Sequence, residues 1–269
     1  MLQGRQENKE LSGRNKMMDQ NWGLRPVLFY IAGFPVESYP VFVFLALLIG
    51  ILVYMIQLKR DGIHKSNALY IAIFAIVGGA IGAKLPIIIM NWNQLNASPE
   101  SVNILLAGRT IVGGLIGGAA GTFLTKKAFK IKERLGNQIA IPVAVGMAVG
   151  RVGCLLRGCC YGQPTNLPWG LDFGDNILRH PTQIYEFIFD LLLVLFLGWK
   201  KARGVKPGEL FKIFLNCYLS FRFLLEFIRV ERVAFIGLTD FQLLCVVSLI
   251  YINRALVINL FRRKEVREV

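Results

Sequence analysis

The segment 150–165, "GRVGCLLRGCCYGQPT", combines side chains that can do chemistry with the end of a long apolar run. Its two arginines carry planar guanidinium groups, which can hold a phosphate through two parallel hydrogen bonds. Its three thiols could act as nucleophiles or metal ligands. These residues are Arg151, Arg157, Cys154, Cys159 and Cys160. The C-x4-C-C spacing is not a standard zinc motif, and the chain has only two histidines. The spacing therefore favours packing cysteines, and we expect no metal and no cofactor.

Other polar side chains fall near the ends of apolar runs. Gln183, Glu186 and Asp190 are spaced three and then four residues apart, so a helix would place them on one face. A second face would carry Tyr218, Arg222, Glu226 and Arg229, and Tyr39 and Lys84 lie in two earlier runs. A charge inside a membrane costs several kcal/mol unless it is paired, so each such residue indicates either function or a structural ion pair.

Structural pairing explains only part of this set. Arg222 and Glu226 are spaced i,i+4, so the two side chains could satisfy each other. The same pairing leaves Arg151 and Lys84 unexplained, because the cations in these runs outnumber the acids. A surplus of positive charge inside a helical bundle favours an anionic ligand. At a membrane boundary, the most available anion is a phospholipid phosphate.

The composition indicates a membrane protein. Of the 269 residues, 54% are hydrophobic and 18% are charged, and a run of about 18 or more apolar residues is long enough to cross a bilayer. Seven such runs predict an all-α, polytopic protein with seven transmembrane helices and a small external cap at 158–182. The expected spans are 39–57, 68–90, 104–124, 137–156, 183–199, 210–228 and 236–258.

The distribution of basic residues predicts the orientation. The net charge of +14 could suggest nucleic acid, but Lys and Arg concentrate in alternate loops and at the C-terminal end. The positive-inside rule then places the N-terminus outside and the C-terminus in the cytoplasm. We therefore expect anionic membrane lipids as partners, and no nucleic acid.

Four motifs resemble one known family. They are "GRTIVGGLIGG" (108–118), "GRVGCLLRGCCYG" (150–162), "HPTQIYE" (180–186) and "YLSFRFLLEFIR" (218–229). In this order, within a seven-helix chain, they resemble the bacterial prolipoprotein diacylglyceryl transferases. The resemblance extends over roughly 26–260. It implies an enzyme of the cytoplasmic (inner) membrane that transfers a diacylglyceryl group from phosphatidylglycerol to the cysteine thiol of a lipoprotein signal peptide.

The resemblance also implies roles for individual residues. Arg151 would hold the lipid headgroup. Arg222, Tyr39 and Tyr218 match essential residues, and His180 is the remaining histidine near the site, with either a catalytic role or one at the helix entry. The substrate-binding set would be Arg151, Lys84, Gly150, Gly162, Gln183 and Glu186. The implied organisation is a flexible external tail at 1–25, a transferase domain at 26–262 and a cytoplasmic tail at 263–269, with a start at Met17 or Met18 as the alternative to Met1.

Departures from the family pattern leave two rival functions open. The third-helix motif of the family ends in a histidine followed by two glycines, and here Val112 stands at the histidine position. Phosphate binding is retained in this interpretation, while activation of the thiol has no evident base. The rivals are a phospholipid-dependent transferase with a different acceptor and a lipid-binding membrane protein without catalysis.

Overall fold

The computed structural model describes residues 24–63, 65–90, 110–132, 135–230, 233–235 and 237–254. Most of the expected N-terminal tail and the whole expected C-terminal tail lie outside these residues. The described part of the chain is mainly helical, as expected. Seven α-helices are present in it: α2 (Ser38–Arg60), α3 (Lys65–Met90), α6 (Ile111–Ala128), α7 (Gly136–Arg157), α8 (Thr182–Ala202), α9 (Glu209–Leu225) and α10 (Asp240–Ile252).

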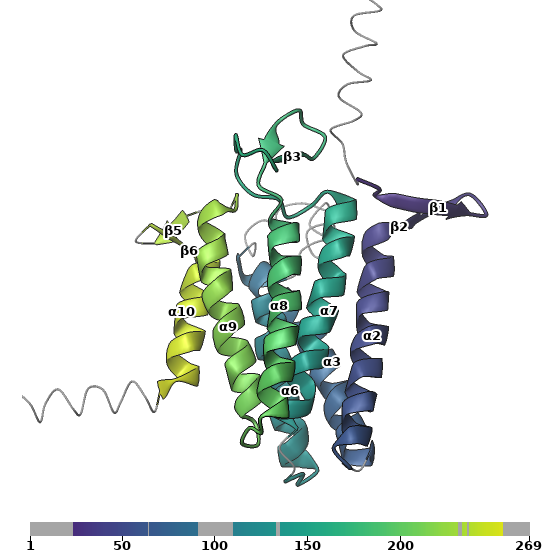
Figure 1. Cartoon of the computed structure of the whole chain (residues 1–269), viewed down its shortest axis with the longest axis vertical. Helices are drawn as coiled ribbons and strands as arrows, with labels where there is room; N and C mark the ends of the chain where they lie inside the picture. Colours follow the sequence, from purple (N-terminus) through teal and green to yellow (C-terminus); the bar gives the residue numbers. More distant parts are fainter. Residues whose placement is uncertain are drawn as a thin grey trace, which may run out of the picture.

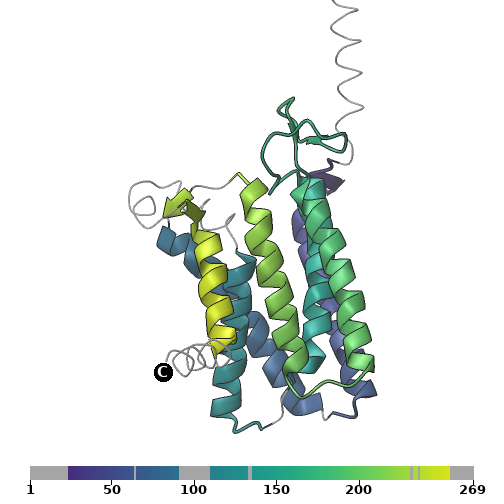
Figure 2. The same cartoon turned by 60° about the vertical axis from the view of Figure 1, so that its left-hand side comes forward.

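These helices form a bundle in which α7 is central (Figure 1). It packs against α2, α8 and α9, and α9 packs in turn against α10. The helices α3 and α6 make a second unit, packed chiefly against each other, which lies behind the first in this view and is seen from its side in Figure 2. The described helices therefore form two units, α2 with α7, α8, α9 and α10, and α3 with α6.

Among the described residues, four helices are long and apolar enough to cross a membrane, namely α2, most of α3, α7 and α8. The remaining three are shorter or carry more charge within the described residues, and the expected sixth span ends at Leu225, in a 3-10 turn (Glu226–Ile228). The chain is thus an all-α membrane protein by helix length and composition, while the count of seven spans stays a prediction.

The polar and apolar faces of α8 follow the expected arrangement. Gln183, Glu186 and Asp190 are each about 1% exposed, whereas Leu192 and Leu195 are 60% and 69% exposed. A helix that buries its carboxylates and exposes its leucines is suited to a lipid surrounding, because its outer face needs no water. This confirms that the three polar residues share one inward face.

In the part of the chain that the structure describes, three two-stranded antiparallel sheets lie at one end of the bundle. The first pairs β1 (Val27–Ile31) with β2 (Phe34–Glu37), and its aromatic side chains are largely exposed. The second pairs β3 (Leu171–Asp172) with β4 (Leu178–Arg179) inside the segment 158–181, which we call the cap. The third pairs β5 (Val233–Phe235) with β6 (Leu238–Thr239) just before α10. Figure 1 shows all three at the same end, which we call the cap end.

Glycines allow α3 and α6 to approach closely. A Cβ atom added at Gly82 would lie 2.5 Å from the carbonyl oxygen of Gly113 and 2.6 Å from the Cα of Gly117. Real Cβ atoms do not approach backbone this closely, so even a methyl group forces the helices apart. The small-xxx-small pattern here serves packing, as expected.

We predict that Gly82→Ala destabilises the bundle by about 1–3 kcal/mol, the usual cost of overpacking. Gly198→Ala in α8 is the matched control, because a Cβ there meets no atom within 4 Å. Thermal unfolding in detergent measures both variants. Equal midpoints for the two would show that the α3–α6 contact is looser than the structure has it.

Candidate functional site

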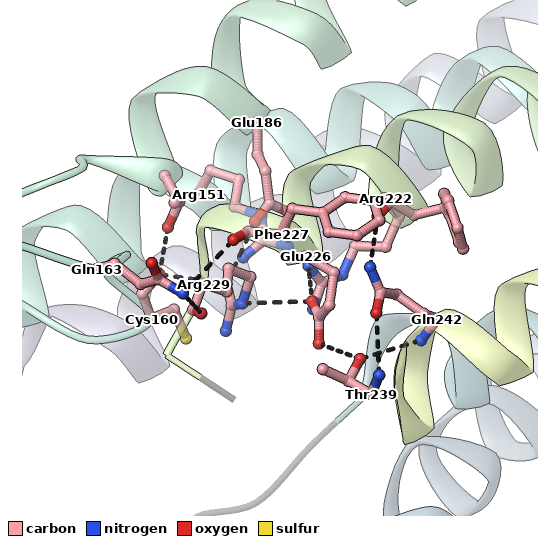
Figure 3. Close-up of polar contacts among 12 residues, drawn as sticks. Arg151, Cys160, Gln163, Glu186, Arg222, Glu226, Phe227, Arg229, Thr239 and Gln242 are labelled. Carbon is pink, nitrogen blue, oxygen red and sulfur yellow. Dashed lines mark hydrogen bonds and ion pairs between the residues drawn. The ribbon is translucent and has the colours of Figure 1, made fainter. Parts of the chain in front are cut away.

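Five buried charged side chains from three neighbouring segments meet near the cap end (Figure 3). Arg151 of α7 pairs with Glu186 of α8. The other carboxylate oxygen of Glu186 lies 3.5 Å from Arg229, whose Nε is 3.8 Å from Glu226. Glu226 also pairs with Arg222 of α9 at 2.6 Å. The order Arg151–Glu186–Arg229–Glu226–Arg222 alternates in sign, and we call it the ion-pair chain.

The ion-pair chain contains three cations and two anions. Each side chain is at most 10% exposed, so water contributes little to solvating its charge. Breaking a buried pair leaves an uncompensated charge at a cost of about 3–5 kcal/mol. The i,i+4 pairing expected between Arg222 and Glu226 is confirmed. It does not neutralise the group, because one positive charge remains in excess.

The start of α10 and the cap hold this chain in place. The hydroxyl of Thr239 donates to Glu226 at 3.1 Å, and Thr239 also forms a capping box with Gln242. The Gln163 amide donates to the Arg229 carbonyl at 3.2 Å. Gln163 and Gln242 were not among the residues predicted from the sequence, because amides near helix ends and in loops give no signal until the fold brings them to the charges.

A cavity of about 1840 Å³ opens beside the ion-pair chain. At the cap end it is lined by the three arginines of the chain together with Tyr39, Lys84 and Gly150. Further along, its walls come chiefly from α2, α3, α6 and α7 and are mainly Ala, Ile, Leu, Val and Gly, while the end opposite the cap is lined by charged residues of α6 and around the start of α9, namely Lys126, Lys206, Glu209 and Lys212. A cationic end joined to an apolar body fits an amphiphile with an anionic head. A Cβ atom added at Gly150 would meet no atom within 4 Å, so packing does not require a glycine at this position.

Tyr218 and Asp190 are buried one helical turn from Arg222 and Glu186, respectively. Tyr218 is 1% exposed and stacks on Phe214 at 6.2 Å between ring centroids. Within the part of the chain that the structure describes, neither the Tyr218 hydroxyl nor the Asp190 carboxylate has a hydrogen-bond partner. Buried polar groups without a hydrogen-bond partner are rare in folded proteins, so these two indicate a functional position.

His180 and Gly162 belong to the cap. His180 Nδ1 lies 3.2 Å from the hydroxyl of Tyr185, which accepts a hydrogen bond from Trp169 at 2.8 Å. The imidazole is not among the residues that line the cavity in the described chain. Gly162 donates its N–H to the His180 carbonyl, and a Cβ on it would lie 2.5 Å from the carbonyl oxygen of Ile228. Gly162 thus allows the cap to approach the end of α9, and the catalytic role of His180 stays a prediction.

The cap also contains an exposed ion pair. Arg179 donates two hydrogen bonds to Asp175, and this interaction holds the pKa of the Asp175 carboxyl below its usual range. Asp172 accepts from three successive backbone N–H groups, of Gly174, Asp175 and Asn176. These bonds fix the β3–β4 turn, which lies above the ends of α7 and α8 in Figure 1.

Comparison with known proteins identifies the family. A model of the prolipoprotein diacylglyceryl transferase family matches residues 26–258. The phosphatidylglycerol–prolipoprotein diacylglyceryl transferase of Clostridium tetani (strain Massachusetts / E88) is 36% identical over 215 residues, covering 77% of this chain and 86% of that protein. The enzyme of the same name from Dehalococcoides mccartyi (strain ATCC BAA-2266 / KCTC 15142 / 195) is 31% identical over 255 residues, covering 90% and 95%. This chain therefore belongs to the prolipoprotein diacylglyceryl transferase family.

Proposed function

We propose that this protein transfers a diacylglyceryl group from phosphatidylglycerol to the cysteine thiol of lipoprotein signal peptides. The new bond joins the thiol sulfur to the glyceryl carbon. The carbon–oxygen bond to the phosphate breaks, glycerol phosphate leaves with the electron pair, and the thiol proton is lost. The observation that carries this proposal is the position of Arg151, Arg222 and Arg229 at the cap end of a cavity whose middle walls are mainly apolar.

In this proposal the cap end of the cavity binds the donor's phosphate and the apolar walls bind its acyl chains. Arg151 and Arg222 hold phosphate oxygens, and their negative partners Glu186 and Glu226 keep the guanidinium groups oriented before the lipid arrives. Lys84 adds positive charge from the opposite wall. A leaving phosphate gains negative charge in the transition state, so fixed cations lower the barrier without reorganising.

Tyr39, Tyr218 and Gln183 complete the proposed site. Tyr39 lines the cavity, and the guanidinium of Arg157 lies 5.2 Å from the centre of its ring, which holds the phenol beside the end of α7. Tyr218 supplies a buried hydroxyl that interacts electrostatically with Glu186 and Arg151. Gln183 donates to the carbonyl of Cys159 at 2.5 Å and so positions the segment that follows α7.

We further propose that the cap end faces the outside of the cytoplasmic membrane. The last turns of α2, α6 and α8 carry Lys59 and Arg60, Lys126 and Lys127, and Lys200 and Lys201, all at the end opposite the cap. Clusters of Lys and Arg favour the cytoplasmic side. In this proposed orientation the N-terminus would lie outside and the C-terminus inside, and the arginines would lie at the level of outer-leaflet headgroups.

Cysteine labelling tests this orientation. In a variant whose native cysteines are replaced, Asn166→Cys in the cap should react with an impermeant maleimide in intact cells. Lys132→Cys, near the opposite end, should react only after permeabilisation. Both positions are exposed, so access to the side chain is matched. The reverse pattern would remove the outer-leaflet assignment.

The reaction itself is tested with purified protein, phosphatidylglycerol vesicles and a signal peptide that contains the acceptor cysteine. We expect a peptide mass increase of one diacylglyceryl group and release of glycerol phosphate in equal amount. A peptide with serine in place of that cysteine is the control and should stay unmodified. Lipid consumption without peptide modification would indicate another acceptor, and binding without consumption would indicate a non-catalytic lipid-binding protein.

A further inference from the structure

Three thiols gather where α7 ends. The sulfur atoms of Cys154, Cys159 and Cys160 all lie within 4.8 Å of one another, and those of Cys159 and Cys160 are 3.8 Å apart. The chain makes this possible by turning back at the end of the helix. Gly158 has φ 71° and Cys160 has φ 67°, two left-handed residues that fold the segment onto the last turn of α7.

The spacing of the sulfurs matches a metal site. Zinc–sulfur bonds are about 2.3 Å long, so thiolates at three corners of a tetrahedron lie about 3.8 Å from one another. A disulfide would need two sulfurs to approach to about 2.05 Å. The observed distances lie much closer to the first arrangement than to the second. A shift of about 1 Å in the widest pair brings all three sulfurs into tetrahedral positions.

Buried side chains hold the backbone of this cluster. Thr182 and Arg229 both donate to the carbonyl of Cys160, at 2.5 and 3.2 Å, and Gln183 donates to that of Cys159. Thr182 and Gln183 are at most 1% exposed. Metal sites depend on hydrogen bonds around the ligand residues, because these bonds orient the ligands before the ion binds. The cluster therefore has the rigidity of a built site.

The surrounding charge favours bound thiolates. Three thiolates and one divalent cation carry a net charge of −1. Arg151 lies one helical turn before Cys154, Arg157 follows it, and Arg229 contacts the cluster backbone. Because the ion-pair chain already has one cation in excess, an anionic complex beside it is electrostatically stabilised. Neutral cysteine thiols that serve only packing would not be stabilised by the positive potential of these arginines.

We propose that Cys154, Cys159 and Cys160 bind a thiophilic divalent cation of the zinc type, with a fourth coordination position open to the cavity. Cys154 and Cys160 line the cavity, so the open position faces the donor site. Catalytic zinc sites keep such a position for water or substrate.

The ligand proposed for this position is the acceptor's own cysteine, a role that rests on the proposed function. On binding, the acceptor thiol loses its proton to solvent. The metal-bound sulfur then attacks the glyceryl carbon, and the phosphate leaves as described above. The site would thus supply the thiolate in a chain whose cavity wall carries Val112 and, within the described residues, no histidine.

Cobalt is the spectroscopic probe for the site. The purified protein, reduced and kept without oxygen, should bind one Co²⁺ and develop the thiolate-to-cobalt absorption bands of a site with three sulfurs. The triple variant Cys154→Ser, Cys159→Ser and Cys160→Ser should show no such band. The matched control is Cys217→Ser with Cys245→Ser, which removes the two other thiols and should leave the spectrum unchanged. Absence of the band from the unmodified protein overturns the site.

The open position is tested with the same complex. Adding the cysteine-containing signal peptide should increase the charge-transfer absorption, because a fourth sulfur binds cobalt. The serine peptide should leave the spectrum as it was. A spectrum unaffected by the cysteine peptide overturns the open position. A spectrum that responds while no thioether product forms contradicts the proposed function instead, so the two failures are distinguishable.

The pH dependence of turnover separates thiol activation from packing. A free thiol with pKa of about 8.5 is only about 3% ionised at pH 7. The triple serine variant should therefore lose about 30-fold in turnover at pH 7 and recover most of it by pH 9. A loss equal at both pH values, or no loss, would overturn the role in activation.

Discussion

Arg151→Ala is expected to reduce diacylglyceryl transfer by about 30-fold to several thousandfold. Removing one partner from a buried, hydrogen-bonded charge pair costs about 2–5 kcal/mol, and each 1.36 kcal/mol in the barrier is tenfold in rate. Arg151 is 6% exposed and lines the cavity, so water cannot replace its charge. Arg151→Lys should recover little, because an ammonium group offers a point charge in place of a planar fork. Product formation at saturating lipid measures both variants.

A structural role for Arg151 must be separated from a role in binding phosphate. Alanine alone leaves Glu186 buried with Arg229 as its remaining cation at 3.5 Å, which endangers folding. The double variant Arg151→Ala with Glu186→Gln removes both charges of the pair and should restore the unfolding temperature. It should remain inactive. Recovery of transfer in the double variant would show that Arg151 only neutralises Glu186.

Arg222→Ala is the second large effect, with an expected loss of about a hundredfold. Arg222 is 8% exposed, lines the same end of the cavity and forms the last member of the ion-pair chain. Its removal leaves Glu226 with Thr239 at 3.1 Å and Arg229 at 3.8 Å, so the carboxylate stays partly compensated. The protein should therefore fold while lipid use is lost. Binding of phosphatidylglycerol in nanodiscs measures the effect directly.

Glu226→Gln provides the matched comparison. Its amide oxygen can still accept from Thr239, while the negative charge that orients Arg222 is gone. We expect a loss of about tenfold, smaller than that of Arg222→Ala, because the guanidinium that contacts phosphate is retained. If Glu226→Gln were the more damaging change, the carboxylate itself would take part in the reaction.

Local patterns predicted the inward polar face of α8 and the pairing of Arg222 with Glu226. Both follow from helical spacing, which a sequence contains directly. The link between Glu186 and Arg229 could not be predicted in this way, because it joins α8 to the residues after α9 and depends on how the helices pack. The same limit applies to Gln163, whose contact with Arg229 crosses from the cap.

The three cysteines form a cluster that their spacing does not predict. C-x4-C-C resembles no standard zinc motif, because such motifs describe regular turns and hairpins. Here the two left-handed residues Gly158 and Cys160 fold the segment back, so thiols that a straight continuation would separate come together. A non-glycine residue in this conformation is not evident from sequence. The clustering depends on a backbone path that spacing alone does not contain, and the expectation of packing residues stays a prediction beside the proposed metal site.

The cavity between the α3–α6 pair and the α2–α7 pair has a kinetic consequence. Its walls are apolar over most of their length, so a lipid bound there keeps its tails in the same phase as the surrounding bilayer. Donor and product would exchange sideways, without passing through water. The rate of encounter would then depend on lipids per unit area, and diluting the donor with neutral lipid at constant bulk concentration would slow the reaction. For such an enzyme, the lipid composition of the membrane would determine how fully the cavity is occupied by donor.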